Sequence, residues 1–255
     1  MRLALLVAAA LTIGAGGDAT RLPSPAHIVV IMFENKDASQ INAQTAPTFD
    51  SLGNRYARLT DYRGVTHPSL PNYLALVSGS THGITNDCTT CSVDGESIGD
   101  QLTHAGRSWA AYAEGFPSSL GFAKKHVPFL YFAYGATHVR SLSQLDPHRL
   151  PDFAFVVPNL CHDMHDCSVD TGDAWLKRFV APLLGVPNTV VFVVFDEGSR
   201  GNHVAAFALG TAVRPHSVFT HRVDHYGLLR TIEQMWGLPL LGSARTARAI
   251  DGIWR

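Results

Sequence analysis

Carboxylate and amide side chains follow two strongly apolar runs of the chain. Four of them come directly after the runs His27–Phe33 and Thr189–Phe195: Glu34, Asn35, Asp196 and Glu197. If both runs are parallel strands of one sheet, these residues lie at the same sheet edge, where gathered negative charge is unfavourable unless a cation lies between them. Such oxygen ligands suit Ca, Mg or Mn better than Zn, although Asp and Glu also bind Zn. The pattern indicates a divalent-metal site, with ordinary solvated loop carboxylates as the alternative.

A serine stands at the start of a short predicted helix. Ser69 is followed by apolar residues at helical spacing, and Gly79 ends the segment, so Ser69 is expected at the helix N-cap. A plain capping serine is the simpler interpretation. Beside a cation, however, its alkoxide would be stabilised, and the free N–H groups and dipole of a helix start favour a phosphate. A serine in this position could attack phosphorus and form a phosphoserine.

Alternating strand and helix patterns must position these residues. Strands are predicted at His27–Phe33, Phe153–Val157 and Thr189–Phe195, with a weaker one at Val204–Leu209. Helices are predicted over the apolar stripes of residues 175–184 and 228–236, the second capped by Asp224 and ended by Gly237. This alternation predicts an α/β fold, a mostly parallel central sheet with helices on both faces. No linker composition divides the chain, so residues 20–255 are expected to form one catalytic domain.

Composition and the N-terminus narrow the class of protein. The 255 residues carry 20 Lys+Arg and 21 Asp+Glu, a net charge of −1, which gives no reason to expect a nucleic-acid partner. Hydrophobic residues make up 46% of the chain, enough for a sizeable core, which excludes a disordered protein. The apolar run Leu3–Ile13 is too short to span a membrane and is followed by small residues, which is typical of a signal peptide. We expect residues 1–19 to be removed and the mature protein to be secreted or periplasmic.

Four cysteines fit an exported protein. They form two closely spaced pairs, and of the three ways of joining them we predict the local disulfides Cys88–Cys91 and Cys161–Cys167. The stabilisation expected for loops this short is only about 2 kcal/mol each, so fixing the shape of a loop is the more useful effect. The second loop, C-H-D-M-H-D-C, contains two histidines and two aspartates.

The motifs together resemble the bacterial phosphoesterase family, which includes secreted acid phosphatases and phospholipases C of the alkaline phosphatase-like fold. The resemblance rests on H-I-V-V-I-M-F-E-N, H-P-S-L-P-N-Y-L-A-L-V-S-G-S-T-H-G-I-T, K-K-H-V-P-F, P-N-L-C-H-D-M-H-D-C-S-V-D-T-G-D-A-W-L and V-V-F-V-V-F-D-E-G, in that order. It is strongest for the short acid-phosphatase branch, which includes secreted enzymes acting on phosphoinositides.

The resemblance implies roles for individual residues. Ser69 would be the nucleophile, and the divalent metal (Ca, Mg, Mn or Zn) would lie among Glu34, Asn35, Ser69, Asp196 and Glu197. His165 is expected to act as general acid, with Asp163 or Asp166 orienting it or serving a second metal. Phosphate or substrate contacts are expected from Asn72, His126 and His225, the last of which could instead be a capping or packing residue at the start of the final helix.

The sequence therefore predicts a metal-assisted phosphomonoesterase that acts on a small phosphorylated substrate as a monomer. A phosphoinositide substrate would bring it into transient contact with a lipid surface. A phospholipase C-type phosphodiesterase would share every motif. A serine carboxylesterase is a rival class, but Ser69 lies in H-P-S-L-P and not in a G-x-S-x-G turn. A non-catalytic exported binding protein would have no need to bring Ser69, Asn72, His165 and the acidic pairs together.

Overall fold

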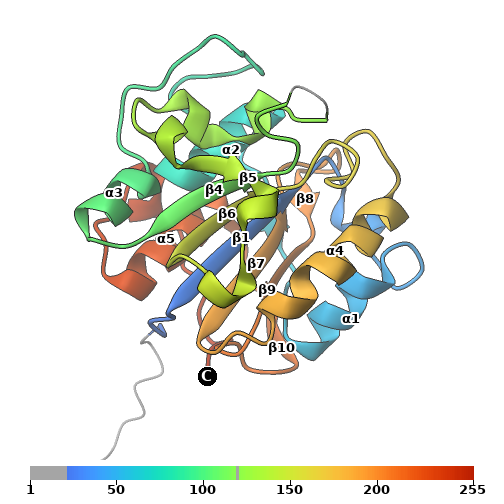
Figure 1. The fold of residues 1–255 in the computed structure, drawn as a ribbon. Helices are drawn as coiled ribbons and strands as arrows, with labels where there is room; N and C mark the ends of the chain where they lie inside the picture. Colours follow the sequence, from blue (N-terminus) through green and yellow to red (C-terminus); the bar gives the residue numbers. More distant parts are fainter. Residues whose placement is uncertain (1–21, 119–120) are drawn as a thin grey trace, which may run out of the picture.

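A central sheet organises the molecule in the computed structural model, which describes residues 22–118 and 121–255 (Figure 1). Within these residues the sheet has eight strands, in the spatial order β10 (Ser217–Phe219), β2 (Ala57–Leu59), β9 (Ala206–Leu209), β7 (Thr189–Phe195), β1 (His27–Phe33), β6 (Phe153–Val157), β4 (Trp109–Ala113) and β5 (Val139–Ser141). The expected signal peptide lies outside the described residues. No helix in the described part of the chain is long and apolar enough to cross a membrane.

The sheet is mostly parallel, as the sequence predicts. β1 lies between β7 and β6 and is parallel to both, whereas β9 runs antiparallel between β7 and β2. In the β1–β7 register Phe33 is opposite Phe195, so the residues that follow them emerge side by side. All residues of β7, and all but the first of β1, are buried, which explains their unbroken apolar sequences.

The predicted strand over Val204–Leu209 is wrong as a single element. The chain passes from one sheet to another at Ala205: β8 (His203–Val204) pairs with β3 (Tyr62–Arg63), and β9 pairs with β7 and β2. With β11 (Val223–Asp224), β3 and β8 make a small second sheet. An apolar run alone does not reveal such a crossing.

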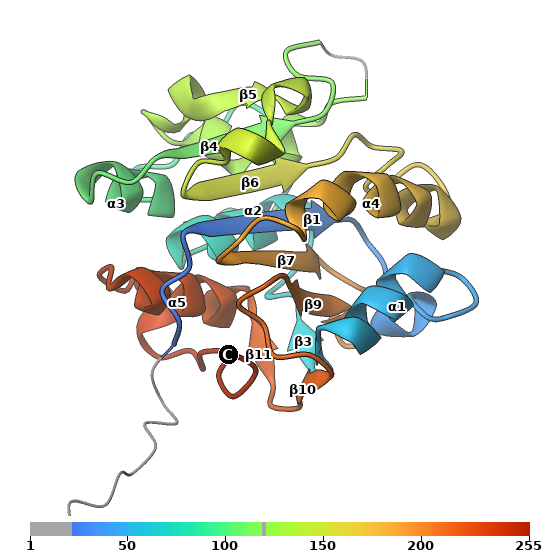
Figure 2. The ribbon, with the colours of Figure 1, turned by 60° about the horizontal axis from the view of Figure 1, so that its bottom comes forward.

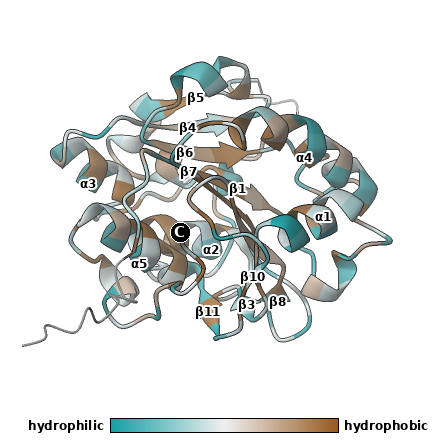
Figure 3. Ribbon diagram, turned by 90° about the horizontal axis from the view of Figure 1, so that it is seen from below, coloured by the Kyte–Doolittle hydropathy of each residue, from teal (hydrophilic) through white to brown (hydrophobic). Residues whose placement is uncertain are grey.

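Helices cover both faces of the large sheet, as predicted. α1 (Pro47–Arg55) and α4 (Val169–Leu183) lie on one face, and α2 (Ser69–Ser78), α3 (Ile98–His104) and α5 (His225–Trp236) lie on the other (Figure 2). Apolar residues concentrate on the strands, and the polar residues of α1 and α4 are on their outer sides (Figure 3). The remaining helical segments are short 3-10 turns: Ala38–Gln40, Lys124–His126, Pro128–Tyr131, Gly135–His138, Leu142–Gln144, Pro147–Arg149 and Gly242–Arg245.

α2 is buried along its whole length between the sheet and α5. Its N-cap is Pro68, so Ser69 is the first helical residue and not the cap that the sequence predicts. Gly79 ends the helix in the left-handed conformation, and a Cβ there would come within 2.3 Å of the carbonyl oxygen of Leu241. Close packing against the segment that follows α5 therefore fixes the helix end.

Candidate active site

The ends of β1 and β7 bring two carboxylates together at one edge of the sheet. Glu34 and Asp196 follow the paired residues Phe33 and Phe195, and both are fully buried. Asn35 has a positive φ of 54°, which Asn tolerates, and its backbone N–H donates to Asp196 Oδ1 at 2.9 Å. Its side-chain amide nitrogen donates to Glu34 Oε2 at 3.2 Å. These contacts do not test whether Asn35 binds a metal, so that role stays a prediction.

α2 delivers Ser69 to the same place. The Ser69 hydroxyl donates to Glu34 Oε2 at 3.0 Å and lies 3.5 Å from Glu197 Oε1. One turn further along the helix, the Tyr73 hydroxyl donates to the other oxygen of Glu34. Tyr73 was missed by the sequence reasoning, although its i+4 spacing from Ser69 places it on the same helix face.

His126 lies inside this group of acids. Its Nε2 is 3.2 Å from Glu34 Oε2, and its Nδ1 is 3.2 Å from Asp163 Oδ2. The ring is 1% exposed and stacks on Tyr73. The sequence predicts a phosphate contact for His126, but its position between two carboxylates makes it part of the acidic cluster. We call Glu34, His126, Asp163 and Asp196 the buried cluster.

Asp163 enters the buried cluster from the disulfide loop Cys161–Cys167. Both predicted disulfides are confirmed. The carbonyl oxygen of Asp163 accepts a hydrogen bond from the backbone N–H of Glu34 at 2.8 Å, which ties the loop to the end of β1. Asp163 Oδ1 accepts the backbone N–H of His165 at 2.7 Å. The loop thus holds a cluster carboxylate and His165 in one fixed turn.

Burial dominates the electrostatics of the cluster. It raises the pKa of Glu34 well above its usual range, and the charges of Asp196 and Asp163 raise this pKa further. It also raises the pKa of Asp163 to about 7 and the pKa of Asp196 to about 6. Burial lowers the pKa of His126 to about 3, so the imidazole is neutral at pH 7.

A neutral His126 cannot satisfy both of its acidic neighbours. Because only one ring nitrogen carries a proton, the other directs a lone pair at a carboxylate. Among the described side chains, His126 Nε2, Asp163 Oδ2 and Asp196 Oδ2 are buried without a hydrogen-bond partner. Ligand atoms of Glu34, His126 and Asp163 lie within 4.8 Å of one another. A group of this composition and spacing, in which His126 and Asp163 each have an unpartnered atom, fits a divalent cation.

His165 lies beside the cluster and is partly exposed. Its ring centre is 5.6 Å from that of His126. His165 Nδ1 is 2.6 Å from Asp166 Oδ1, so Asp166, and not Asp163, is the carboxylate that contacts the imidazole. This contact holds the ring through Nδ1.

Asn72 and His225, for which the sequence predicts phosphate or substrate contacts, are both hydrogen-bonded to other groups of the protein. Asn72 accepts the backbone N–H groups of Val65 and Thr66, and its amide donates to the carbonyl oxygens of Thr66 and Pro68. A phosphate contact would require one of these hydrogen bonds to break. In this structure Asn72 therefore holds the backbone of the segment before Ser69 in place.

His225 is fully buried. Its Nε2 is 2.7 Å from the carbonyl oxygen of Asp196, and its Nδ1 is 3.0 Å from the Tyr62 hydroxyl. Both nitrogens therefore have hydrogen-bond partners within the protein, and the ring supports the end of β7 through the Asp196 carbonyl group. This corresponds to the packing role, which was the alternative interpretation from sequence.

Charged pairs surround the start of α2. His67 forms an ion-pair contact with Glu197 Oε2. Asp87 accepts the backbone N–H of Leu70 at 2.9 Å and pairs with Lys125, whose Nζ lies 2.8 Å from Asp87 Oδ2. Sequence reasoning missed Asp87 and assigned no role to Lys125, because no periodic pattern connects these irregular segments to Ser69.

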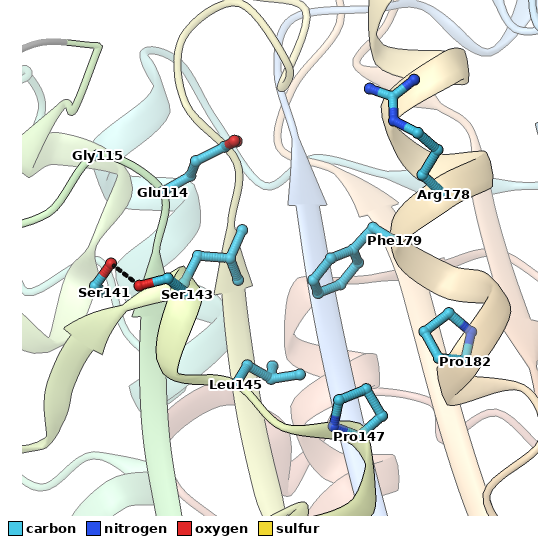
Figure 4. A pocket seen from close by; sticks show the side chains of 10 residues that line it. Glu114, Gly115, Ser141, Ser143, Leu145, Pro147, Arg178, Phe179 and Pro182 are labelled. Carbon is cyan, nitrogen blue, oxygen red and sulfur yellow. Dashed lines mark hydrogen bonds between the residues drawn. The ribbon is translucent and has the colours of Figure 1, made fainter.

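A separate cavity of about 490 Å³ lies between the end of β4, the segment after β5 and α4 (Figure 4). Glu114, Arg178 and Phe179 are among its lining residues, and no member of the buried cluster is. Glu114 Oε2 accepts the backbone N–H of Asn159 at 3.0 Å and lies 2.8 Å from His162 Nδ1. Glu114, which lines the cavity, therefore contacts both the disulfide loop, at His162, and the residue Asn159 that precedes the loop.

Comparisons with known proteins agree with this geometry. The phosphoesterase family matches residues 38–239. A phosphatidylinositol-3-phosphatase of Mycobacterium tuberculosis is 36% identical, over 94% of this chain and 86% of that protein. An acid phosphatase of Aspergillus fumigatus is 30% identical over 72% of this chain, which spans about half (49%) of the fungal enzyme. A Vibrio parahaemolyticus protein of the alkaline phosphatase superfamily superposes with a TM-score of 0.65 at 12% identity, covering 89% of this chain and 71% of that one. The fold is therefore alkaline phosphatase-like.

Proposed function

The chain belongs to the phosphoesterase family and is a phosphate-ester hydrolase, and we propose that it is an exported, metal-assisted phosphomonoesterase acting through a phosphoserine at Ser69. One observation carries the proposal. The Ser69 hydroxyl, 1% exposed at the start of α2, donates to Glu34 beside buried acceptors that have no hydrogen-bond partner. A serine used only as a helix cap would need none of these neighbours.

Glu34, Asp196 and His126 would hold the metal ion, and Asp163 would accept the Nδ1 proton of His126 and orient its ring. A nitrogen ligand among carboxylates favours Mn or Zn over Ca or Mg, unlike the oxygen-only set expected from the sequence. When bound, the ion would supply Lewis acidity at the phosphoryl oxygens and favour ionisation of a nearby hydroxyl.

Side chains of the protein would carry out the nucleophilic attack and the proton transfers. Ser69 Oγ attacks phosphorus, its proton passes to Glu34 Oε2, and the bond from phosphorus to the leaving oxygen breaks. His165 Nε2 protonates that oxygen, while Asp166 steadies the ring through Nδ1. Water then attacks the phosphoserine, and His165 removes a proton from the water. The bond from phosphorus to Ser69 Oγ breaks, Glu34 returns its proton to Oγ, and phosphate is released.

The substrate class is a small phosphate monoester. A phosphoinositide is one candidate, because the relative from Mycobacterium tuberculosis that matches most of this chain is named a phosphatidylinositol-3-phosphatase. Two disulfides support a secreted or periplasmic location, since disulfides persist in oxidising compartments.

The test compares Ser69→Ala with Ser78→Ala, a buried serine at the other end of the same helix. Release of p-nitrophenol from p-nitrophenyl phosphate is measured, and acid-quenched protein is digested to find phosphoserine by mass spectrometry. We expect Ser69→Ala to lose both turnover and the phosphopeptide, while Ser78→Ala keeps both.

Substantial turnover by Ser69→Ala would overturn the mechanism. Faster hydrolysis of a phosphocholine diester than of the monoester would instead favour the phospholipase C-type alternative. Inhibition by an acyl-serine reagent without inhibition by a chelator would favour the esterase class.

A further inference from the structure

A lysine lies beside the buried cluster without a role in the proposed chemistry. Lys125 directly precedes His126 in the 3-10 turn Lys124–His126, and its side chain is 22% exposed. Its ammonium group pairs with Asp87 Oδ2 at 2.8 Å. The Lys125 side chain is therefore mostly buried, unlike a lysine that extends into solvent.

Asp87 connects the Lys125 ammonium group to the helix turn that begins at Ser69. Asp87 Oδ1 accepts the N–H of Leu70, the residue after Ser69, so one carboxylate contacts both the start of α2 and Lys125. Glu34 and Asp196 are among the carboxylates whose charges act on the lysine. The Lys125 charge also acts on Glu197 and His126. Lys125 thus lies near the site and is connected to the start of α2 through Asp87.

The other disulfide loop holds the pair in place. Asp87 immediately precedes the Cys88–Cys91 disulfide. The Tyr131 hydroxyl donates to the carbonyl oxygen of Cys88 at 2.9 Å. This contact joins the loop to the turn Pro128–Tyr131, which follows the turn that carries Lys125. The small disulfide loop therefore fixes a charged pair at the start of α2.

The geometry points to Lys125 as the residue that binds a non-bridging oxygen of the substrate phosphate and gives preference to doubly charged monoesters over singly charged diesters. The proposal rests on the proposed phosphomonoesterase function. An ammonium group has three N–H donors, so Lys125 can keep its bond to Asp87 and donate to phosphate as well. A monoester at pH 7 carries a second negative charge that a diester lacks, and a fixed cation favours the more highly charged ligand.

A second lysine serves as the matched control. Lys124 is adjacent, but its ammonium group is bound to a loop carbonyl and lies 4.7 Å from the centre of the Tyr131 ring. Lys125→Met and Lys124→Met each remove one charge from the same turn. Binding of inorganic phosphate is measured by calorimetry, which requires no turnover, and kcat/KM is measured for p-nitrophenyl phosphate and for bis(p-nitrophenyl) phosphate.

We expect Lys125→Met to weaken phosphate binding and monoester kcat/KM by about 10- to 100-fold, the usual size of a lost charge-assisted hydrogen bond. The diester should lose about threefold or less, because it lacks the second charge. Lys125→Arg should recover part of the monoester activity, and Lys124→Met should stay within about twofold of wild type, as for an exposed charge.

Equal phosphate affinity in the two Met variants would overturn the assignment, and so would an equal loss on monoester and diester. If Lys125→Met does not fold, the variant Asp87→Asn provides the test. The Asn side chain keeps an acceptor for the Leu70 N–H but removes the charge that pairs with Lys125. Phosphate binding should then be unchanged or tighter, and weaker binding would refute the proposal. Absence of any phosphatase activity in wild type would instead refute the proposed function, which separates the two failures.

Discussion

Metal binding at the buried cluster is expected to compete with protons. In the metal-free protein burial raises the pKa of Asp163 to about 7 and the pKa of Asp196 to about 6. A bound cation needs Glu34 and Asp196 ionised as ligands and Asp163 ionised as acceptor of the His126 proton, and the pKa of Glu34 is also raised well above its usual range. Metal affinity should therefore decline as the pH falls through the raised pKa values of these groups.

The size of the effect follows from the two pKa values. Between pH 7 and pH 5 proton competition at Asp163 weakens binding by about 50-fold, and competition at Asp196 weakens it by about tenfold. Together they predict an apparent dissociation constant at least roughly 500-fold higher at pH 5 than at pH 7, and protonation of Glu34 adds to this dependence. His126 adds nothing, because burial lowers its pKa to about 3 and it stays neutral over this range.

Titration with Mn²⁺, followed by the electron paramagnetic resonance signal of the free ion, measures the constant at each pH. Asp163→Asn should remove the contribution of Asp163 and make the pH dependence about 50-fold smaller. Glu233→Gln is the control: burial raises the pKa of this carboxyl to about 8, and it lies outside the cluster, so the variant should behave as wild type. A Mn²⁺ affinity that is the same at pH 5 and pH 7 would refute the assignment of the cluster as the metal site.

Two further changes test the segment before Ser69 and a buried carboxyl group on α5. Asn72→Ala should lower kcat by about 10- to 100-fold with little change in KM, because two backbone N–H groups before Ser69 lose their acceptor. Steady-state kinetics measures this, and a raised KM at unchanged kcat would indicate a direct phosphate contact instead. Glu233→Gln should raise the free energy of unfolding at pH 7 by about 1–2 kcal/mol, because burial raises the carboxyl pKa to about 8 and the wild type loses stability as the pH rises from about 4.5 towards that value. Urea unfolding should show no such gain at pH 4.5, and an equal gain at both pH values would contradict this explanation.

The parts of the site that the sequence predicts are those attached to regular elements. Glu34 and Asp196 follow buried strands whose apolar runs are unambiguous, and the parallel register places their ends together. Ser69 begins a helix that ends at a glycine, so its position is predicted to within one residue. The disulfides follow from the short spacing of the cysteines.

The parts that the sequence does not predict come from irregular segments. His126 is carried by a short 3-10 turn, and nothing in K-K-H indicates that its ring is buried between two acids. Asp87 and Asn72 act through backbone groups of neighbouring segments, and such contacts leave no periodic pattern in the sequence. Their roles depend on tertiary placement alone.

The start of α2 shows how this placement changes the chemistry. A free helix N-terminus would offer backbone N–H groups to a phosphate, as expected for Ser69 from sequence. In this first turn, however, Pro71 has no N–H and the N–H of Leu70 is already donated to Asp87. The same carboxylate pairs with Lys125. A side-chain cation near the helix start therefore takes the place of the backbone donors that the sequence predicts. Because the buried cluster is acidic and the substrate is also an anion, binding requires positive charge from elsewhere. The proposed metal ion and Lys125 would supply such charge.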